Sequence, residues 1–266
     1  YGENMKADYK NWIPTEMLTG IISGFLVSVI LFVMFGVRGV MGDDFVKTIA
    51  MFVFGILSII LFVASLWVIY AYRAFSYNGS RHLSKDIIEG VSEHVYLPAG
   101  GKGLDVGCGS AALTIACARK NPQGIMIGVD KWGQEYSAFT KDLCERNARA
   151  EGIHNVDFLP GDANKLDFDD ESFDAVTSNY VYHNIHSTDK QELLLESLRV
   201  LKKGGCFAIH DIMGRAYGDM EDFAQKLKDM GYEEVKLIKT DDGKFMTSTE
   251  AKIIRLNDST LLVGKK

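Results

Sequence analysis

The chain has 266 residues, of which 47 % are hydrophobic, and it carries a formal net charge of −6 at pH 7. Residues 1–83 hold six of the 29 basic and five of the 35 acidic side chains, so residues 84–266 carry seven more acidic than basic groups. Nucleic-acid-binding domains concentrate positive charge, so this excess of acidic groups argues against a nucleic-acid partner.

Two long uncharged runs near the N-terminus, residues 17–37 and 48–72, predict a membrane hairpin. Each run is long enough for a helix to cross about 30 Å of hydrocarbon, and soluble helices rarely stay apolar on every face for that length. Aromatic residues typical of membrane interfaces flank the runs: Tyr9, Trp12, Trp67, Tyr70 and Tyr72. We expect transmembrane helices at about residues 13–37 and 48–73, within an N-terminal segment of residues 1–83.

The placement of lysine and arginine sets the expected orientation of this hairpin. Two basic residues, Arg38 and Lys47, lie in the connecting loop, and five flank the outer ends: Lys6, Lys10, Arg73, Arg81 and Lys85. Positive residues concentrate on the cytoplasmic side, so both termini and the following domain should be cytoplasmic. Gly20 and Gly24 have the spacing that lets transmembrane helices pack closely, within one chain or in an oligomer.

An α/β domain is expected over residues 84–266. Ser84 is a suitable N-cap for a short helix ending near His94, and Thr247 should cap a later helical turn. From Gly103 onward, strand-like and helical patterns alternate, which is typical of a doubly wound sheet. Strands are predicted at residues 103–107, 124–130, 155–159, 173–179, 204–210, 233–239 and 260–264. Helices are predicted at residues 110–120, 133–151, 189–202 and 218–231.

The most informative segment is 103–111, Gly-Leu-Asp-Val-Gly-Cys-Gly-Ser-Ala, where a strand runs into a glycine turn that opens a helix. Gly107 and Gly109 let the backbone bend sharply and approach a ligand, and the helix start offers free N–H groups. Asp130 follows about 20 residues later at a strand end, where a carboxylate can accept hydrogen bonds from ribose hydroxyls. A nicotinamide dinucleotide fits this pattern as well, but Asp105 beside the turn suits a ligand with a cationic end better.

Five motifs stand in order along residues 90–266: Asp105-x-Gly107-x-Gly109, Asp130, Gly161-Asp162-Ala163, Phe173-Asp174-Ala175-Val176 and Leu201-Lys-Lys-Gly-Gly205. In this order they resemble the motifs of class I S-adenosylmethionine-dependent methyltransferases, and the chain is similar to the ubiquinone-biosynthesis-type branch that acts on small molecules. One departure is Ala111, where many members have a third glycine. The resemblance implies a Rossmann-like methyltransferase sheet with S-adenosyl-L-methionine as the cofactor.

The resemblance also implies which residues hold this cofactor. Asp130 would bind the ribose hydroxyls, Asp162 and Ala163 would bind adenine, and Lys131 would cover one adenine face. Asp105 would lie near the methionine amino group, or else accept hydrogen bonds from neighbouring backbone amides. The expected cofactor-binding residues are Asp105, Gly107, Cys108, Gly109, Asp130, Lys131, Asp162, Ala163 and Asn179.

The acceptor is expected beside the segment that follows the fourth strand, Asn179-Tyr-Val-Tyr-His-Asn-Ile-His186. By resemblance His183 faces the substrate, and a histidine can accept a proton at neutral pH. The alternative is that His183 only holds local structure. Tyr180 and His210 are expected in the substrate pocket, unless His210 is a core residue. Lower-ranked pocket candidates are Tyr182, His186 and Asp211, and Tyr182 has simple packing as its alternative.

These features together predict a membrane-anchored methyltransferase acting on a small acceptor that is lipophilic or membrane-associated. Two alternatives stay open: a nicotinamide-dependent oxidoreductase that shares the glycine turn, and a non-catalytic cofactor-binding module that docks at the membrane. Methyl transfer mainly requires alignment of the reacting groups, so acid–base residues do not identify the acceptor. The four cysteines lack the paired spacing of a zinc site or a disulfide framework, and no metal is expected.

Overall fold

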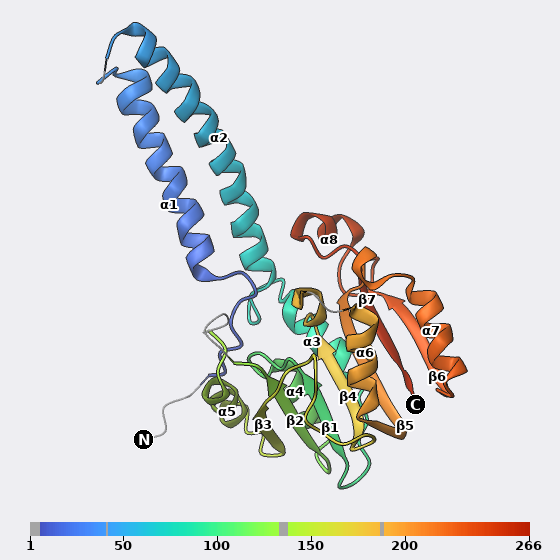
Figure 1. The fold of residues 1–266 in the computed structure, drawn as a ribbon. Coiled ribbons are helices and arrows are strands. Elements are labelled where there is room, and N and C mark those ends of the chain that lie inside the picture. The colour runs from blue at the N-terminus through green and yellow to red at the C-terminus, as the bar shows by residue number, and fades with distance from the viewer. Residues whose placement is uncertain (1–5, 41, 133–137, 187–188) are drawn as a thin grey trace, which may run out of the picture. The chain divides into compact units, whose positions relative to one another are not determined.

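The computed structural model describes residues 6–40, 42–132, 138–186 and 189–266. These residues form two compact units, one made of Asn11–Ser84 and the other of Lys85–Lys266 together with the described residues that precede Asn11. In Figure 1 the first unit contains the helices α1 and α2, and the second contains the sheet.

The first unit is a pair of apolar helices that lie side by side (Figure 1). α1, Thr15–Leu31, continues into a π-helical segment, Phe32–Val37, and α2 spans Asp44–Ala74. Asp43 starts α2 by accepting a hydrogen bond from the Val46 N–H, as an N-cap residue does. Both helices are long and apolar enough to cross a membrane, and most of their large apolar side chains are exposed.

Gly36, in the π-helical segment Phe32–Val37, approaches α2 more closely than Gly20 or Gly24 does. A β-carbon built on Gly36 would lie 2.7 Å from the Cα of Met51, which leaves space for glycine alone. Among the described residues, Gly20 has no atom within 4 Å of such a carbon, and Gly24 has an ordinary contact of 3.8 Å with Leu61. Gly20 therefore does not help α1 and α2 to pack, Gly24 faces α2 at an ordinary contact distance, and the close approach that needs a glycine occurs at Gly36.

The second unit is a seven-stranded mixed sheet in the order β3-β2-β1-β4-β5-β7-β6 (Figure 1). β7 runs antiparallel to β5 and β6, and the other neighbours pair in parallel. The strands are β1 Lys102–Val106, β2 Ile125–Asp130, β3 Val156–Pro160, β4 Phe173–Asn179, β5 Leu201–Ile212, β6 Glu234–Lys239 and β7 Ser259–Lys265. The helices are α3 Leu83–Ser92, α4 Ala112–Lys120, α5 Lys141–Ala150, α6 Lys190–Arg199, α7 Met220–Asp229 and α8 Ser248–Ile254. Two short 3₁₀ helices span Tyr182–Asn184 and Arg215–Tyr217.

The central strands of this sheet carry the core. Fully buried apolar side chains from β1, β4 and β5 include Leu104, Val106, Val176, Phe207 and Ile209. Continuous apolar runs of this kind are typical of parallel strands that are covered on both faces. The chain order reverses between β1 and β4, which is where α/β sheets of this kind bind ligands, beyond the carboxyl ends of the strands.

The predicted α/β sheet is confirmed, and the main difference concerns the helix expected at residues 133–151. In the structure α5 begins at Lys141, because Thr140 accepts a hydrogen bond from the Leu143 N–H and caps the helix there. Residues 138–140 are not helical, and residues 133–137 lie outside the described residues. The expected cap at Thr247 is present at the start of α8.

Two further boundaries differ from the predictions. The helix expected at residues 189–202 ends at Arg199, because Leu201 already pairs with Phe173 in the sheet. Ser84 is not an N-cap: it lies inside α3, and its hydroxyl donates a hydrogen bond of 2.9 Å to the carbonyl of Phe75. Both corrections concern contacts with residues distant in sequence, which override local capping patterns.

Candidate functional site

The glycine turn joins β1 to α4 and makes a sharp bend. Gly107 and Gly109 have positive φ angles of 72° and 54°, and a β-carbon on Gly107 would lie 2.3 Å from its nearest side-chain neighbour. The N–H groups of Gly107 and Cys108 both donate to the carbonyl of Val129 on β2, at 2.8 and 3.0 Å. Within the described residues, a β-carbon on Gly109 would meet only Phe139, at an ordinary contact distance of 3.9 Å.

Asp130 ends β2, and its carboxylate lies against this turn. Its Oδ2 accepts a hydrogen bond of 2.8 Å from the Gly109 N–H, and its Oδ1 lies 3.5 Å from the Trp132 nitrogen. The Gly161 N–H donates to the carbonyl of Asp130 at 3.0 Å, which brings the segment after β3 to the same place. The ends of β1, β2 and β3 therefore meet around one half-buried carboxylate.

Asp105 is buried against α4 instead of facing the solvent. It is 1 % exposed, and its Oδ2 accepts a hydrogen bond of 2.5 Å from the Thr114 hydroxyl. Burial raises the pKa of Asp105 to about 7, while the hydrogen bond from Thr114 opposes this shift and the Asp130 carboxylate adds to it. The side chain of Asp105 thus links β1 to α4 beside the turn.

Asp162 and Lys131 form a second polar pair near Asp130. The Oδ1 of Asp162 accepts hydrogen bonds from the N–H and the side-chain amide of Asn164, at 2.9 and 2.7 Å, and its Oδ2 lies 3.5 Å from Lys131 Nζ. The Asn164 hydrogen bonds lower the pKa of Asp162 despite some burial, and the positive charge of Lys131 lowers it further. Ala163 follows in the same turn and is half-buried. An ionised carboxylate thus lies one strand away from Asp130.

His210 belongs to the core of the second unit. β4 and β5 align Asn179 with His210, and the Asn179 Oδ1 lies 2.8 Å from His210 Nδ1. The other ring nitrogen, Nε2, lies 2.7 Å from the Thr240 hydroxyl, and His210 is 0 % exposed. Burial lowers the pKa of His210 to about 3, so the imidazole is neutral near pH 7. The structure contradicts the expectation that His210 lines the acceptor pocket, because both nitrogens are bonded inside the core.

His183 is held by the buried carboxylate of Asp211, which the sequence ranks only as a minor pocket candidate. His183 Nδ1 lies 2.5 Å from Asp211 Oδ1, and the His183 side chain is 30 % exposed while that of Asp211 is 0 % exposed. The Oδ2 of Asp211 accepts hydrogen bonds from the backbone N–H groups of Tyr182 and His183, at 2.8 and 3.2 Å. Burial acts to raise the pKa of Asp211, but the hydrogen bond and charge of His183 hold it below its ordinary value.

This geometry is suited to proton transfer. A carboxylate at Nδ1 holds the imidazole with its proton on that nitrogen and leaves Nε2 as an acceptor. The sequence places Asp211 only at the end of the fifth strand. The register of β5 against β4, which aligns His210 with Asn179, brings it beside the segment that carries His183.

The tyrosines near His183 have different environments. Tyr180 has a φ of 54°, which is uncommon and strained for a bulky residue, and such strain clusters at functional sites. Its hydroxyl is hydrogen-bonded to that of Ser259 at 2.8 Å, and its ring meets the His183 ring edge-on with centroids 6.0 Å apart. Tyr182 is 0 % exposed and bonded to the Ser197 hydroxyl at 2.7 Å, which fits its packing alternative.

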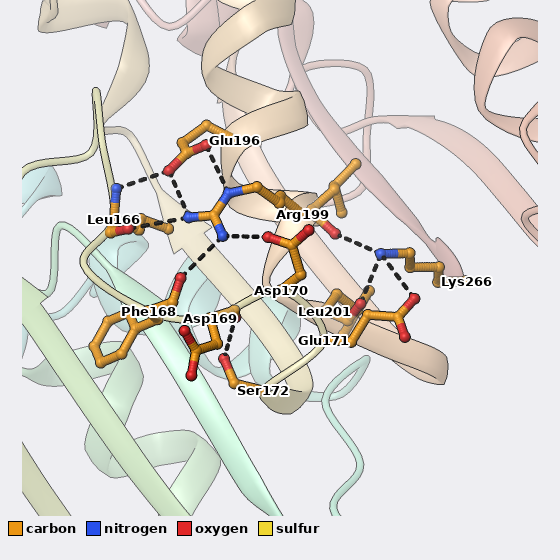
Figure 2. A network of polar contacts seen from close by, with 11 residues as sticks. Leu166, Phe168, Asp169, Asp170, Glu171, Ser172, Glu196, Arg199, Leu201 and Lys266 are labelled. Carbon is orange, nitrogen blue, oxygen red and sulfur yellow. Dashed lines mark hydrogen bonds and ion pairs between the residues drawn. The ribbon is translucent and has the colours of Figure 1, made fainter.

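Arg199 on α6 forms hydrogen bonds with the loop that leads from Asp162 to β4 (Figure 2). Its guanidinium donates hydrogen bonds of 2.9 and 3.0 Å to Glu196 and of 2.6 Å to Asp170. It also donates to the carbonyls of Leu166 and Phe168, at 3.0 and 2.9 Å. No sequence motif predicts this network, which fixes the loop by joining carboxylates and main-chain carbonyls to one planar group.

A family model described as a methyltransferase domain matches residues 98–255, which include every expected cofactor-binding residue. The chain belongs to this methyltransferase family. Residues 98–255 are thus an S-adenosylmethionine-dependent methyltransferase domain, and the match does not support the oxidoreductase alternative. The fold of this methyltransferase is similar to that of the [4+2]-cyclase SpnF, with a TM-score of 0.52 and 21 % identity, over 71 % of this chain and 84 % of that one.

Curated relatives share part of this methyltransferase. A demethylmenaquinone methyltransferase from Geobacillus stearothermophilus is 37 % identical over 128 residues, which cover 47 % of this chain and 50 % of the relative. Methyltransferase GfsG from Streptomyces halstedii is 34 % identical over 137 residues, which cover 51 % of this chain and 46 % of the relative. The chain therefore spans about half the length of these relatives.

Proposed function

We propose that the chain is a membrane-anchored S-adenosylmethionine-dependent methyltransferase that transfers a methyl group to a small lipophilic acceptor. The observation that carries this proposal is the 2.8 Å hydrogen bond from the Gly109 N–H to Asp130 Oδ2, which joins an open glycine turn to a partly exposed carboxylate. Asp130 would accept hydrogen bonds from the ribose hydroxyls, while the backbone of residues 107–109 lies along the methionine part.

The remaining cofactor contacts would follow the same edge of the sheet. Asp162 would accept from the adenine amino group, the Ala163 N–H would donate to a ring nitrogen, and Lys131 would lie over one adenine face. The backbone at Asn179 would meet the methionine end, and Asp105 would support the turn from beneath. When bound, the cofactor supplies a methyl group already activated on a sulfonium.

His183 would act as the proton acceptor. As the acceptor atom bonds to the methyl carbon, the methyl–sulfur bond would break and leave its electron pair on the sulfur. The acceptor's proton would pass to His183 Nε2, and the buried Asp211 carboxylate would stabilise the imidazolium that forms. Tyr180, whose ring lies beside His183, would form part of the acceptor pocket. The larger part of the rate enhancement comes from holding the acceptor in line with the methyl group.

Two observations support a lipophilic acceptor at a membrane. α1 and α2 meet the length and composition of membrane-spanning helices, and their exposed apolar side chains would be covered by lipid. Several relatives carry the name demethylmenaquinone methyltransferase, and that named substrate belongs to those proteins. The basic residues outside the hairpin favour cytoplasmic termini and a cytoplasmic catalytic domain, and the two helices offer a surface for oligomer formation.

The experiment that tests this function uses the full chain in lipid vesicles with methyl-labelled S-adenosylmethionine and demethylmenaquinone kept reduced to its quinol by dithionite, because only the electron-rich quinol ring can attack the sulfonium methyl. Label should enter the lipid extract, and it should be lost with His183→Gln. If the wild-type chain binds S-adenosylmethionine but labels neither demethylmenaquinone nor a cell lipid extract, the alternative of a non-catalytic docking module takes the place of the proposed enzyme.

A further inference from the structure

The segment before α1 packs on the candidate cofactor turn. The Asp8 N–H donates to Asn147 Oδ1 at 2.7 Å, and the Asn147 side-chain amide donates to the carbonyls of Asp8 and Ser110, both at 2.9 Å. The Ser110 hydroxyl in turn donates to the carbonyl of Tyr9 at 2.9 Å. Residues 8 and 9 are called the N-terminal strap below.

The strap is an integral part of the methyltransferase unit. Tyr9 is 6 % exposed, Ser110 is 7 % exposed and Asn147 is 1 % exposed. The side-chain oxygen of Asn147 accepts a hydrogen bond from the strap, and its amide nitrogen donates to the strap and to Ser110. Leaving such buried polar groups unpaired costs free energy of folding. Without the strap, the Oδ1 of Asn147 and one of its two amide N–H groups would lose their protein partners.

We propose that the N-terminal strap is part of the cofactor-binding site and that Asn147 is the residue that positions it. This inference rests on the proposed function, because it takes the glycine turn as the place of the cofactor. The strap holds Ser110, and Ser110 directly follows Gly109, whose N–H is bonded to the Asp130 carboxylate. Loss of the strap would let the turn shift at the point where the cofactor is bound.

The strap has an unusual position in the chain. It precedes both apolar helices, whereas the matched methyltransferase domain begins at residue 98. The cofactor site is thus built from chain segments on both sides of the hairpin. Cofactor affinity should therefore depend on a segment that lies outside the family domain.

The test uses the full chain with Asn147→Ala, with Asp8→Pro, which removes the donating N–H, and with both changes. Each single variant should bind S-adenosylmethionine about tenfold more weakly, equal to about 1.4 kcal/mol. At saturating cofactor, kcat should stay within about twofold of wild type, because only binding is affected. The double variant should lose less affinity than the product of the two single losses, because both changes remove the hydrogen bond from the Asp8 N–H to Asn147.

Asn155→Ala is the matched control. Asn155 donates to three carbonyls, those of Ala118, Asn121 and Gly124, at 3.0, 3.1 and 2.9 Å, and it precedes β3 at the opposite end of the strands. This change should lower the melting temperature without altering the affinity for S-adenosylmethionine.

A second readout follows from the reciprocity of coupled binding. If the strap improves cofactor binding, the cofactor must stabilise the docked strap to the same extent. S-adenosylmethionine should therefore slow tryptic cleavage after Lys10 in the wild type and protect Asn147→Ala less. Two results would overturn the proposed role of the strap while leaving the proposed function intact. One is wild-type affinity for S-adenosylmethionine in both single variants, and the other is equal protection from trypsin in wild type and Asn147→Ala. A wild-type chain that binds no S-adenosylmethionine would overturn both.

Discussion

Replacing Asp211 with asparagine tests the proton-accepting role of His183. The Oδ1 of Asp211 faces His183 Nδ1 at 2.5 Å and the Ile212 N–H at 2.7 Å, and Oδ2 faces the N–H groups of Tyr182 and His183. An asparagine amide must present its NH₂ group to one of these sides. Toward Nδ1 it would donate, which moves the imidazole proton to Nε2 and removes the acceptor. If the NH₂ group instead faced the backbone N–H groups of Tyr182 and His183, those buried donors would lose their acceptor.

The expected effect of Asp211→Asn is large on catalysis and small on cofactor binding. A general base contributes about 10²–10⁴-fold, so kcat should fall by about that factor. The affinity for S-adenosylmethionine should stay within about twofold of wild type, because Asp211 makes none of the proposed cofactor contacts. Single-turnover transfer of labelled methyl to demethylmenaquinone, reduced to its quinol in vesicles, gives the rate, and calorimetry gives the affinity.

Asp174→Asn is a suitable control for this experiment. Asp174 accepts hydrogen bonds from the Lys102 N–H and from the Lys202 ammonium near the start of β4, at the opposite end of that strand from His183. This change should affect stability alone. A folded Asp211→Asn protein that keeps its wild-type kcat would refute the role of the His183–Asp211 pair.

Three further predictions concern other parts of the molecule. Asp130→Ala should weaken S-adenosylmethionine binding about 100-fold in calorimetry, because it removes charge-assisted hydrogen bonds, and an unchanged affinity would exclude Asp130 from the site. The folded-state pKa of His210, about 3, lies below its ordinary value of 6.5, so the unfolded chain takes up a proton first and stability falls as the pH drops below 6.5. In denaturant unfolding, the stability of the wild type relative to His210→Gln should therefore fall by about 2 kcal/mol between pH 7 and pH 5, because the contributions of other groups such as Asp105 cancel in this difference; an unchanged difference would contradict the assignment. Gly36→Ala should lower the thermal stability of the helix pair in detergent, whereas Gly20→Ala should not, and equal effects would contradict the observed packing.

The sheet and the glycine turn are predictable because their determinants are local. Apolar runs mark β1 and β2, and glycine, as at Gly107 and Gly109, is favoured where a backbone turns with positive φ. Asp130 follows from its place at the end of a strand. These signals lie within a few residues of each element, so one sequence is sufficient to read them.

The roles of His210 and Asp211 cannot be separated from the sequence alone. Adjacent residues of a strand point to opposite faces, so the register of β5 against β4 decides which of the two is buried in the core and which reaches His183. The contact between the strap and Asn147 cannot be predicted from the sequence for another reason. It joins residues 139 positions apart, and it uses main-chain groups that have no residue signature.

Titration calorimetry of the full chain with S-adenosylmethionine and with NAD tests the central claim most directly. The claim is that the Asp130 carboxylate and the backbone of residues 107–109 form one site for an adenosyl sulfonium. We predict saturable binding of S-adenosylmethionine at a single site and no saturable heat with NAD. Saturable binding of NAD without binding of S-adenosylmethionine would contradict the account.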